Sequence, residues 1–219
     1  MNSKTINSKG RLLSLDEPQV MGILNVTPDS FYAGSRKQTE AAIIDRIETI
    51  LREGASIIDV GGYSSRPDAA EVSETEEMQR LEMALRPLLQ HYPDVVVSVD
   101  TFRSSVARLC VEKYGVAMIN DISGGELDER MFDTVAQLRV PYIMMHMRGT
   151  PQTMQQQTDY EDVTAGLLKY FSQKLERLFR LGVNDVILDP GFGFSKTLAQ
   201  NYELMRHLGD FQIFGLPLW

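Results

Sequence analysis

The segment at residues 20–31, with the sequence VMGILNVTPDSF, decides the fold that the rest of the chain predicts. Residues 20–26 form an apolar run that is broken near its end by one amide side chain, Asn25. The run then opens into the turn-forming sequence TPDS at residues 27–30. This pattern predicts a buried strand that carries one polar group to the surface.

Five later apolar runs end in the same way. The polar residues at their ends are Asp59, Asp100, Asn120 with its neighbour Asp121, His146 and Asp189. Successive runs are far enough apart for one helix and two short loops between them. The repetition of strand, polar residue, loop and helix predicts parallel β/α units.

The polar residues all follow their strands, whereas polar residues placed by chance would fall at either end. In a β/α barrel the carboxyl ends of the strands form the face that carries the active site. Carboxylates and amides that meet there suit a flat heterocycle rich in N–H groups, and each bidentate contact contributes roughly 1–3 kcal/mol of discrimination. The six positions together therefore predict a ligand site.

Single positions allow simpler interpretations. Taken alone, Asp100 is better explained as the N-cap of the helix predicted over residues 103–114, a role that Thr101 could also fill. His146 lies among methionines, which favours a hydrogen-bonded core histidine, and the three histidines of the chain do not form a metal motif. Cys110 lies in a helical pattern and is interpreted as a buried structural thiol.

Three loops can be interpreted either as parts of a functional site or as ordinary connections. Residues 33–37 are either a mobile lid or an ordinary connection. The segment GGYSSRP at residues 61–67 offers close backbone approach and Arg66 for an anion, although a plain turn with a surface charge remains open. The segment DPGFGFSK at residues 189–196 lacks the spacing of a Walker loop and is either a ligand wall with Phe194 or a bare turn.

Composition narrows the class of protein. A chain of 219 residues with 43% hydrophobic residues predicts one domain over residues 1–219, with residues 1–19 as a polar extension that forms a short hairpin around Gly10. The net charge of -8 argues against a nucleic-acid partner. A single cysteine and the lack of apolar signal or membrane-spanning segments predict a soluble cytoplasmic protein.

The motifs resemble those of the dihydropteroate synthase family. The matching segments, in the family's order, are MGILNVTPDSF, IIDVGGYSSRP, VSVDT, INDISGG, MHMRGTPQTMQ and DPGFGFSK. The resemblance implies a (β/α)8 barrel that condenses 6-hydroxymethyl-7,8-dihydropterin diphosphate with p-aminobenzoate. The products would be 7,8-dihydropteroate and pyrophosphate, with Mg2+ as cofactor, and the resemblance also allows a homodimer.

The resemblance assigns roles to seven residues of this sequence. It implies that Asp100, Asn120 and Asp189 hold the pterin and serve catalysis, that Asn25 binds the metal and the diphosphate, that Arg66 holds the diphosphate, that Ser65 lies beside both substrates, and that Phe194 lines the aminobenzoate pocket. Carboxylates would favour the cation that develops as diphosphate leaves, while Mg2+ and arginine stabilise the leaving group.

This sequence departs from the family pattern at two places. Tyr63 and Ser65 replace the commoner Glu and Thr, and we expect both replacements to be tolerated. Asp68 replaces a glycine and adds negative charge near the expected anion site, which predicts weaker binding of the diphosphate or aminobenzoate. The chain also stops before the family's Ser-Arg-Lys-Ser segment and its last strand, whereas such barrels typically have about 250 residues. We therefore expect a C-terminally truncated barrel, with apolar strands exposed at both edges and with uncertain activity on its own.

Two other functions remain open from sequence. A barrel that binds methyltetrahydrofolate for a methyltransferase would share the carboxylates and amides, although it would not need Arg66, the segment MRGTPQTMQ at residues 147–155 or the segment GFGFSK at residues 191–196. The second open function is that of a truncated remnant that binds pterin without catalysing a reaction.

Overall fold

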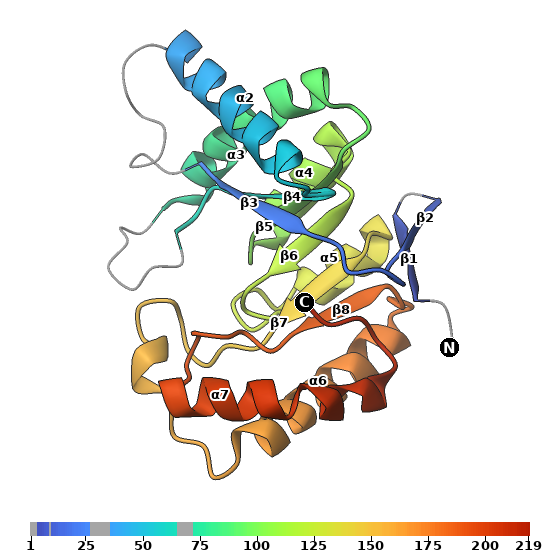
Figure 1. Ribbon diagram of the computed structural model, residues 1–219, viewed down its shortest axis with the longest axis vertical. Coiled ribbons are helices and arrows are strands. Elements are labelled where there is room, and N and C mark those ends of the chain that lie inside the picture. The colour runs from blue at the N-terminus through green and yellow to red at the C-terminus, as the bar shows by residue number, and fades with distance from the viewer. Residues whose placement is uncertain (1–3, 9, 27–35, 65–71) are drawn as a thin grey trace.

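The computed structural model describes residues 4–8, 10–26, 36–64 and 72–219. Its centre is a sheet of six strands in which every neighbouring pair is parallel. In sheet order, which is also chain order, the strands are β3 (Met21–Asn25), β4 (Ile57–Gly61), β5 (Val96–Asp100), β6 (Met118–Asp121), β7 (Tyr142–Met145) and β8 (Val186–Asp189). The predicted β/α repeat is therefore present, and the sheet curves as part of an α/β barrel (Figure 1).

One helix follows each strand and lies on the outer side of the curved sheet (Figure 1). The helices are α2 (Arg36–Arg52), α3 (Glu74–His91), α4 (Ser104–Tyr114), α5 (Met131–Leu138), α6 (Val163–Arg180) and α7 (Leu198–Arg206), with short 3-10 turns η1 (Met154–Gln156) and η2 (Leu208–Phe214).

The helix boundaries follow local chemistry. The Ser73 and Asp162 side chains accept hydrogen bonds from backbone N–H groups at the starts of α3 and α6. Thr197 and Gln200 form a reciprocal capping box at the start of α7. Gly115 ends α4 in a left-handed conformation, which glycine adopts without strain. Because these signals are local, the helix predicted over residues 103–114 agrees with α4 to within one residue.

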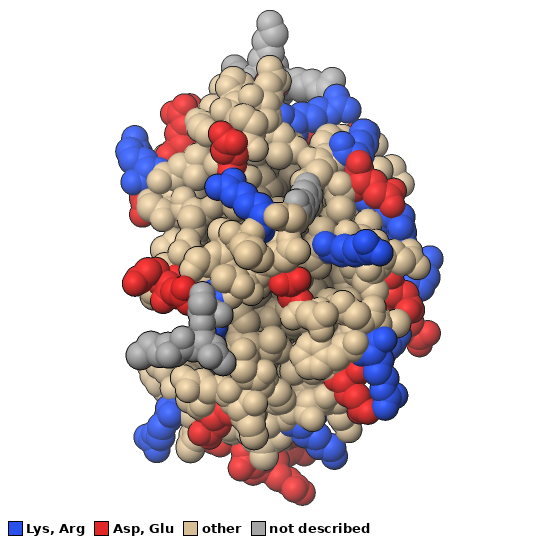
Figure 2. All heavy atoms as spheres, turned by 90° about the vertical axis from the view of Figure 1, so that its right-hand side faces the viewer, with Lys and Arg blue, Asp and Glu red and all other residues tan. Residues whose placement is uncertain are grey.

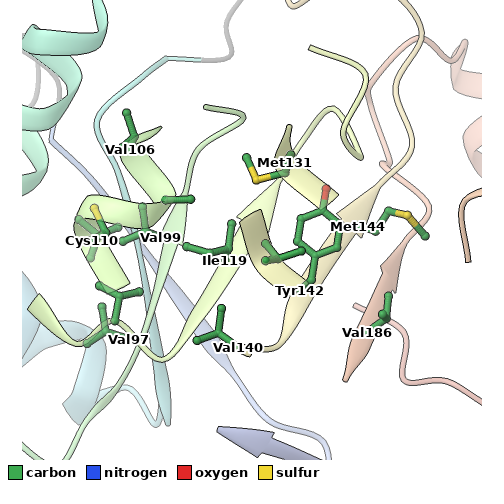
Figure 3. Close-up of a cluster of buried hydrophobic side chains, with 14 of the residues drawn as sticks. Val97, Val99, Val106, Cys110, Ile119, Met131, Val140, Tyr142, Met144 and Val186 are labelled. Carbon is green, nitrogen blue, oxygen red and sulfur yellow. The ribbon is translucent and has the colours of Figure 1, made fainter. Parts of the chain in front are cut away.

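The main apolar core lies between the sheet and the helices. Figure 3 shows Val99 of β5 and Ile119 of β6 in the same cluster as Val106 and Cys110 of α4, and all four are at most 1% exposed. Burial of one such aliphatic side chain contributes about 1.5–3 kcal/mol. Burial also raises the pKa of the Cys110 thiol to about 12, so the prediction of an unreactive structural cysteine is confirmed.

A hairpin covers the amino-terminal end of the sheet. Strands β1 (Thr5–Ser8) and β2 (Arg11–Ser14) pair in antiparallel fashion, as the hairpin prediction around Gly10 required. A second apolar cluster joins the hairpin to the inside of the sheet and consists of Ile6, Ile57, Met118, Ile143 and Ile187. In Figure 1 the hairpin lies at the right and the loops that follow the strands lie at the left. The hairpin thus closes off part of the amino-terminal end of the sheet, and the polar strand ends lie at the opposite, carboxyl end (Figure 1).

The two edges of the sheet differ. On β3, Ile23 is 54% exposed, and none of the described residues pairs with the second side of this strand. This confirms the prediction of an exposed apolar edge at the first strand. On β8, Leu188 donates to Pro217 O (2.9 Å) and accepts from Trp219 N (2.9 Å), so the end of the chain lies alongside this strand. The prediction of an equally exposed second edge is wrong, because the final residues cover it.

Candidate active site

Register places four strand ends on one level of the sheet. Asn25 pairs with Gly61, Gly61 with Asp100, and Asp100 with Asn120. Residues at the same level of a parallel sheet point to the same face, which here is the interior of the barrel. Asp189 ends β8 opposite Met145 of β7 and faces the same interior.

These residues line one cavity of about 230 Å³. Its walls are Ile23, Asn25, Asp59, Tyr63, Ser64, Asp100, Asn120, Ile122, Met145, Asp189, Phe194 and Trp219. The predicted convergence of Asp100, Asn120 and Asp189 is therefore confirmed, and Asn25 and Phe194 lie at the same cavity. The roles assigned to these five residues remain predictions.

The helix-cap interpretation of Asp100 is wrong. Helix α4 begins at Ser104, and the carboxylate that accepts from its backbone N–H (2.9 Å) and hydroxyl (2.6 Å) belongs to Asp128. Asp100 instead points into the barrel. A carboxylate within four residues of a helix start matches the sequence signature of a cap. Asp100 is also the last residue of strand β5, however, and because side chains alternate between the two faces of a strand, its position in β5 directs it into the barrel.

Gly61 explains how Asn25 and Asp100 come close together. A Cβ atom built on this glycine would lie 2.8 Å from Asn25 Oδ1 and 3.6 Å from Asp100 Oδ2. The first distance is too short for a real side chain, so a residue with a Cβ would push the amide away. The glycine thus leaves room for an amide and a carboxylate to flank the same point of the cavity.

Asp59 lies one level deeper than the other polar residues. It pairs in register with Ser98, is only 3% exposed, and accepts a hydrogen bond from Asn120 Nδ2 (2.9 Å). Asp59 Oδ1 and Asn120 Oδ1 are buried and make no hydrogen bond to any described residue. The buried Ser98 hydroxyl, which pairs in register with Asp59 and also lacks a partner, is a nearby protein donor for Asp59 Oδ1. Buried acceptors without partners are rare in folded proteins, so Asn120 Oδ1 indicates a missing donor, which a ligand can supply.

Charge in the cavity is unbalanced toward acid. Burial, followed by the neighbouring carboxylates with Asp59 first, raises the pKa of Asp100 well above its usual range. Burial also raises the pKa of Asp59, and it raises the pKa of Asp189 to about 6 although the Gly191 N–H opposes the shift. A ligand that donates hydrogen bonds or becomes positively charged would relieve this cost.

The loop after β8 is fastened by a buried lysine. Lys196 Nζ donates to Gly191 O (2.9 Å), Phe194 O (2.9 Å) and His146 O (3.2 Å), and the residue is only 4% exposed. Burial lowers the pKa of this ammonium group to about 7. Lys196 therefore holds the loop that carries Phe194 without lining the cavity itself, a role that the sequence did not indicate.

Two polar residues at strand ends point away from the cavity. His146 is 3% exposed with Nδ1 3.1 Å from Lys196 Nζ, and burial lowers its pKa to about 2, which confirms its interpretation as a core histidine. Asp121 faces the outer side of the sheet and accepts from the Ser123 and Gly125 N–H groups and from the Tyr142 hydroxyl (2.7 Å). Asp121 is therefore a structural residue of the loop after β6.

An aromatic wall was missed from sequence. Tyr63 packs edge-on against Phe102 with ring centroids 5.1 Å apart, and Arg103 lies over both rings. The fully buried Glu77 forms an ion pair with Arg103, and Gln152 Nε2 donates to the Tyr63 hydroxyl (3.1 Å). Tyr63, which sequence comparison marked only as a departure, is thus a fixed wall between two loops.

Ser65, Arg66 and Asp68 lie outside the described residues, as do residues 33–35 of the proposed lid. Ser64, the last described residue before them, lines the cavity. Their assigned roles remain predictions.

Among the described residues, the cavity offers few side chains that could bind a metal ion together. The described residues contain no group of three His, Cys, Asp or Glu side chains that could hold a metal ion. Asn25 offers one exposed amide oxygen at the cavity. Mg2+ prefers oxygen ligands and is often held by one or two protein groups together with substrate phosphates. Asn25 fits such a shared site and does not fit a protein-only metal site.

The surface carries charged side chains of both signs (Figure 2). Basic and acidic side chains are interspersed over the face shown in Figure 2. None of the helices in the described part of the chain combines the length and the apolar character that a membrane crossing requires.

Comparison with known proteins identifies the family. The model of the pterin-binding enzymes matches residues 21–219. The dihydropteroate synthase of Escherichia coli is 41% identical over 213 residues, which are 96% of this chain and 74% of that protein. A folic acid synthesis protein of Pneumocystis carinii is 44% identical over 87% of this chain, although the chain spans only 26% of that protein.

Solved structures agree. The Yersinia pestis dihydropteroate synthase, solved with a sulfonamide drug, has a TM-score of 0.87 and 40% identity, over 98% of this chain and 78% of that one. The Xanthomonas albilineans dihydropteroate synthase, solved with 4-aminobenzoic acid, has a TM-score of 0.87 and 36% identity, over 99% of this chain and 77% of that one. The chain therefore belongs to the dihydropteroate synthase family of pterin-binding enzymes.

Proposed function

We propose that this chain carries the active site of a dihydropteroate synthase, a transferase that joins 6-hydroxymethyl-7,8-dihydropterin diphosphate to p-aminobenzoate. The observation that supports this most directly is the cavity in which Asp100, Asn120 and Asp189 meet, where the buried amide oxygen of Asn120 lacks a donor. A pterin presents several N–H groups along one edge. The Xanthomonas albilineans relative, solved with 4-aminobenzoic acid, supports the second substrate.

The acidic cavity suits the chemistry of this reaction. The amine nitrogen of p-aminobenzoate attacks the methylene carbon, a C–N bond forms, and the C–O bond breaks with its electron pair leaving on the diphosphate. The attacking nitrogen then loses a proton. Positive charge that develops on the pterin during C–O cleavage lies among Asp59, Asp100 and Asp189, and fixed negative groups stabilise such charge without reorganisation.

The second substrate fits the rim of the cavity. Phe194 and Tyr63 both line it and offer rings for a flat benzoate, while Lys196 and the Gln152 hydrogen bond fix the loops that carry them. Arg66 and Ser65 follow directly in the chain and are proposed to hold the diphosphate and to lie beside both substrates. A guanidinium group can form two parallel hydrogen bonds with a phosphate.

We also propose Mg2+ as cofactor, shared between Asn25 and the diphosphate. When bound, the ion would neutralise charge on the leaving group. Asn25 would orient the complex through its amide oxygen, and the remaining metal ligands would come from the substrate and water. A homodimer and a cytoplasmic location also remain proposals of this family assignment.

The test is pyrophosphate release from the purified chain. With pterin diphosphate, p-aminobenzoate and Mg2+ all present, release is expected, and omission of p-aminobenzoate should abolish it. Asn120→Ala should reduce the rate strongly, whereas Asp94→Asn, which removes an exposed carboxylate, should not.

Failure of this assay would have two distinct forms. If the chain binds 6-hydroxymethylpterin but releases no pyrophosphate, it is a non-catalytic pterin-binding barrel. If it binds no pterin at all, the proposed function is wrong. A methyltetrahydrofolate-binding barrel has weaker support, because the relatives that match across most of this chain are named dihydropteroate synthases.

A further inference from the structure

Asp59 is a buried acid that the resemblance to the family left without a role. It is the third of the five residues of β4. Ile57, which belongs to the second apolar cluster beneath the hairpin, lies before it, and Gly61, at the level of the cavity, lies after it. The Asp59 side chain is 3% exposed and lines the floor of the cavity. A carboxylate at such a place opposes folding unless its interactions compensate for the lost water. An interaction that serves the site would explain its presence.

The interaction that Asp59 makes is directional. Asn120 Nδ2 donates to Asp59 Oδ2 at 2.9 Å. An asparagine side chain has a donor end and an acceptor end of nearly equal shape, and an ionised carboxylate can only accept. Asp59 therefore selects the orientation in which the nitrogen of Asn120 faces the floor, and the oxygen must face elsewhere.

The other end of the Asn120 amide agrees with this orientation. Asn120 Oδ1 is buried and has no hydrogen-bond partner among the described residues. Asn120 also shares its level of the sheet with Asp100, whose side chain lines the same cavity. Asp100 thus presents carboxylate oxygens at the same level as Asn120, and a flipped Asn120 amide would present N–H groups instead.

We propose that Asp59 is a positioning residue that locks the amide of Asn120 so that its oxygen, and not its nitrogen, faces the ligand. The proposal rests on the proposed function, because it assumes that Asn120 contacts a pterin. It assigns a specificity role to the pair: Asp59 keeps Asn120 an acceptor at the same level as Asp100, which selects for the N–H edge of the heterocycle and against a ligand that offers acceptors there.

A charge-preserving exchange separates this role from simple packing. In Asp59→Asn, the new amide can donate to or accept from Asn120, so both orientations become available. In Asn120→Asp, two acidic groups face each other and the contact is lost. In the double variant, the amide introduced at position 59 would donate to one oxygen of the new carboxylate at position 120, and the other oxygen of that carboxylate would again face the ligand. The double variant also keeps the net charge of the parent chain.

The experiment measures binding of 6-hydroxymethylpterin by isothermal titration calorimetry to the full chain and the three variants. Each single variant should bind about tenfold more weakly, because a site built for one hydrogen-bond pattern leaves polar groups unpaired in the other. The double variant should recover to within about threefold of the parent. Thermal unfolding of each variant, with Asp94→Asn as a surface control, checks that the fold is intact.

Two results would overturn the proposal. Unchanged pterin affinity in Asp59→Asn would show that the amide orientation does not depend on Asp59. A double variant no better than Asn120→Asp alone would show the same, and this comparison holds even if Asp59→Asn does not fold. Absence of pterin binding by the parent chain would instead reject the proposed function together with the inference, so the two failures are distinguishable.

Discussion

The two ends of the sheet interior are built from opposite kinds of residue, although the same strands form both. At the amino-terminal end, Ile57 and Met118 pack against the hairpin in a dry cluster. Two positions further along the same strands stand Asp59 and Asn120, which face the cavity. Side chains that face the interior repeat every two residues along a strand. Two successive interior positions of one strand therefore serve different purposes, the first stabilising the fold and the second lining the ligand cavity. Stability and ligand affinity should therefore respond to different substitutions.

The largest effect is expected at the apolar end. Met118→Ala truncates a side chain that is 0% exposed and belongs to the apolar cluster under the hairpin. Such truncations cost about 2–5 kcal/mol because the cavity left behind does not collapse fully. Urea denaturation measures the change. A loss below about 1 kcal/mol would show that the hairpin does not depend on this packing.

At the polar end, Asp189→Asn should weaken ligand binding and increase the stability of the fold. Pterin affinity should fall about 10- to 100-fold, because a carboxylate that accepts two hydrogen bonds is replaced by an amide that accepts one. The free energy of unfolding at pH 8 should rise by about 1–3 kcal/mol, since burial raises the pKa of Asp189 to about 6 and thereby makes its ionised form unfavourable in the folded chain. Calorimetry and urea denaturation at pH 8 and pH 4 test both parts, and the stability gain should vanish at pH 4.

The same raised pKa predicts how binding responds to pH. The folded-state pKa of Asp189, about 6, lies above its ordinary value of 3.8. The acceptor form is therefore lost as pH falls through about 6, and pterin affinity should decrease up to tenfold per pH unit below that point. Titrations from pH 8 to pH 5 measure the slope. Asp189→Asn should flatten it, and an equal slope in that variant would assign the titration to another group.

The smallest effect is expected behind the wall of the cavity. Lys196→Met removes three hydrogen bonds to backbone carbonyls and should let the loop that carries Phe194 move. We expect the KM for p-aminobenzoate to rise about fivefold, equivalent to about 1 kcal/mol, with pterin affinity nearly unchanged. Lys169→Met, which alters an exposed lysine, is the matched control. An equal loss for both substrates would mean that Lys196 supports the whole site.

Much of this fold was predictable because its signals are local. The apolar runs gave the order of the strands, and the spacing between them left room for one helix each. The cap at Ser73 and the glycine at position 115, which bound helices in the structure, likewise act within a few residues. The polar ends of the strands also predicted that Asp100, Asn120 and Asp189 would meet, because the carboxyl ends of parallel strands share one edge. The interpretation of Asp100 as a helix cap failed because proximity to a helix start does not reveal which face of the strand a side chain occupies.

The sequence by itself determined the β/α repeat, the position of the polar residues along each strand and the family of the chain. Only the tertiary structure decided which of those residues face the interior. Asn120 and Asp121 are neighbours with similar chemistry, yet one lines the cavity and the other holds an outer loop. Both faces of a barrel strand are buried, so hydrophobic pattern alone does not distinguish inside from outside. Register and curvature make that choice, and they also placed Asp59 beneath the amide of Asn120.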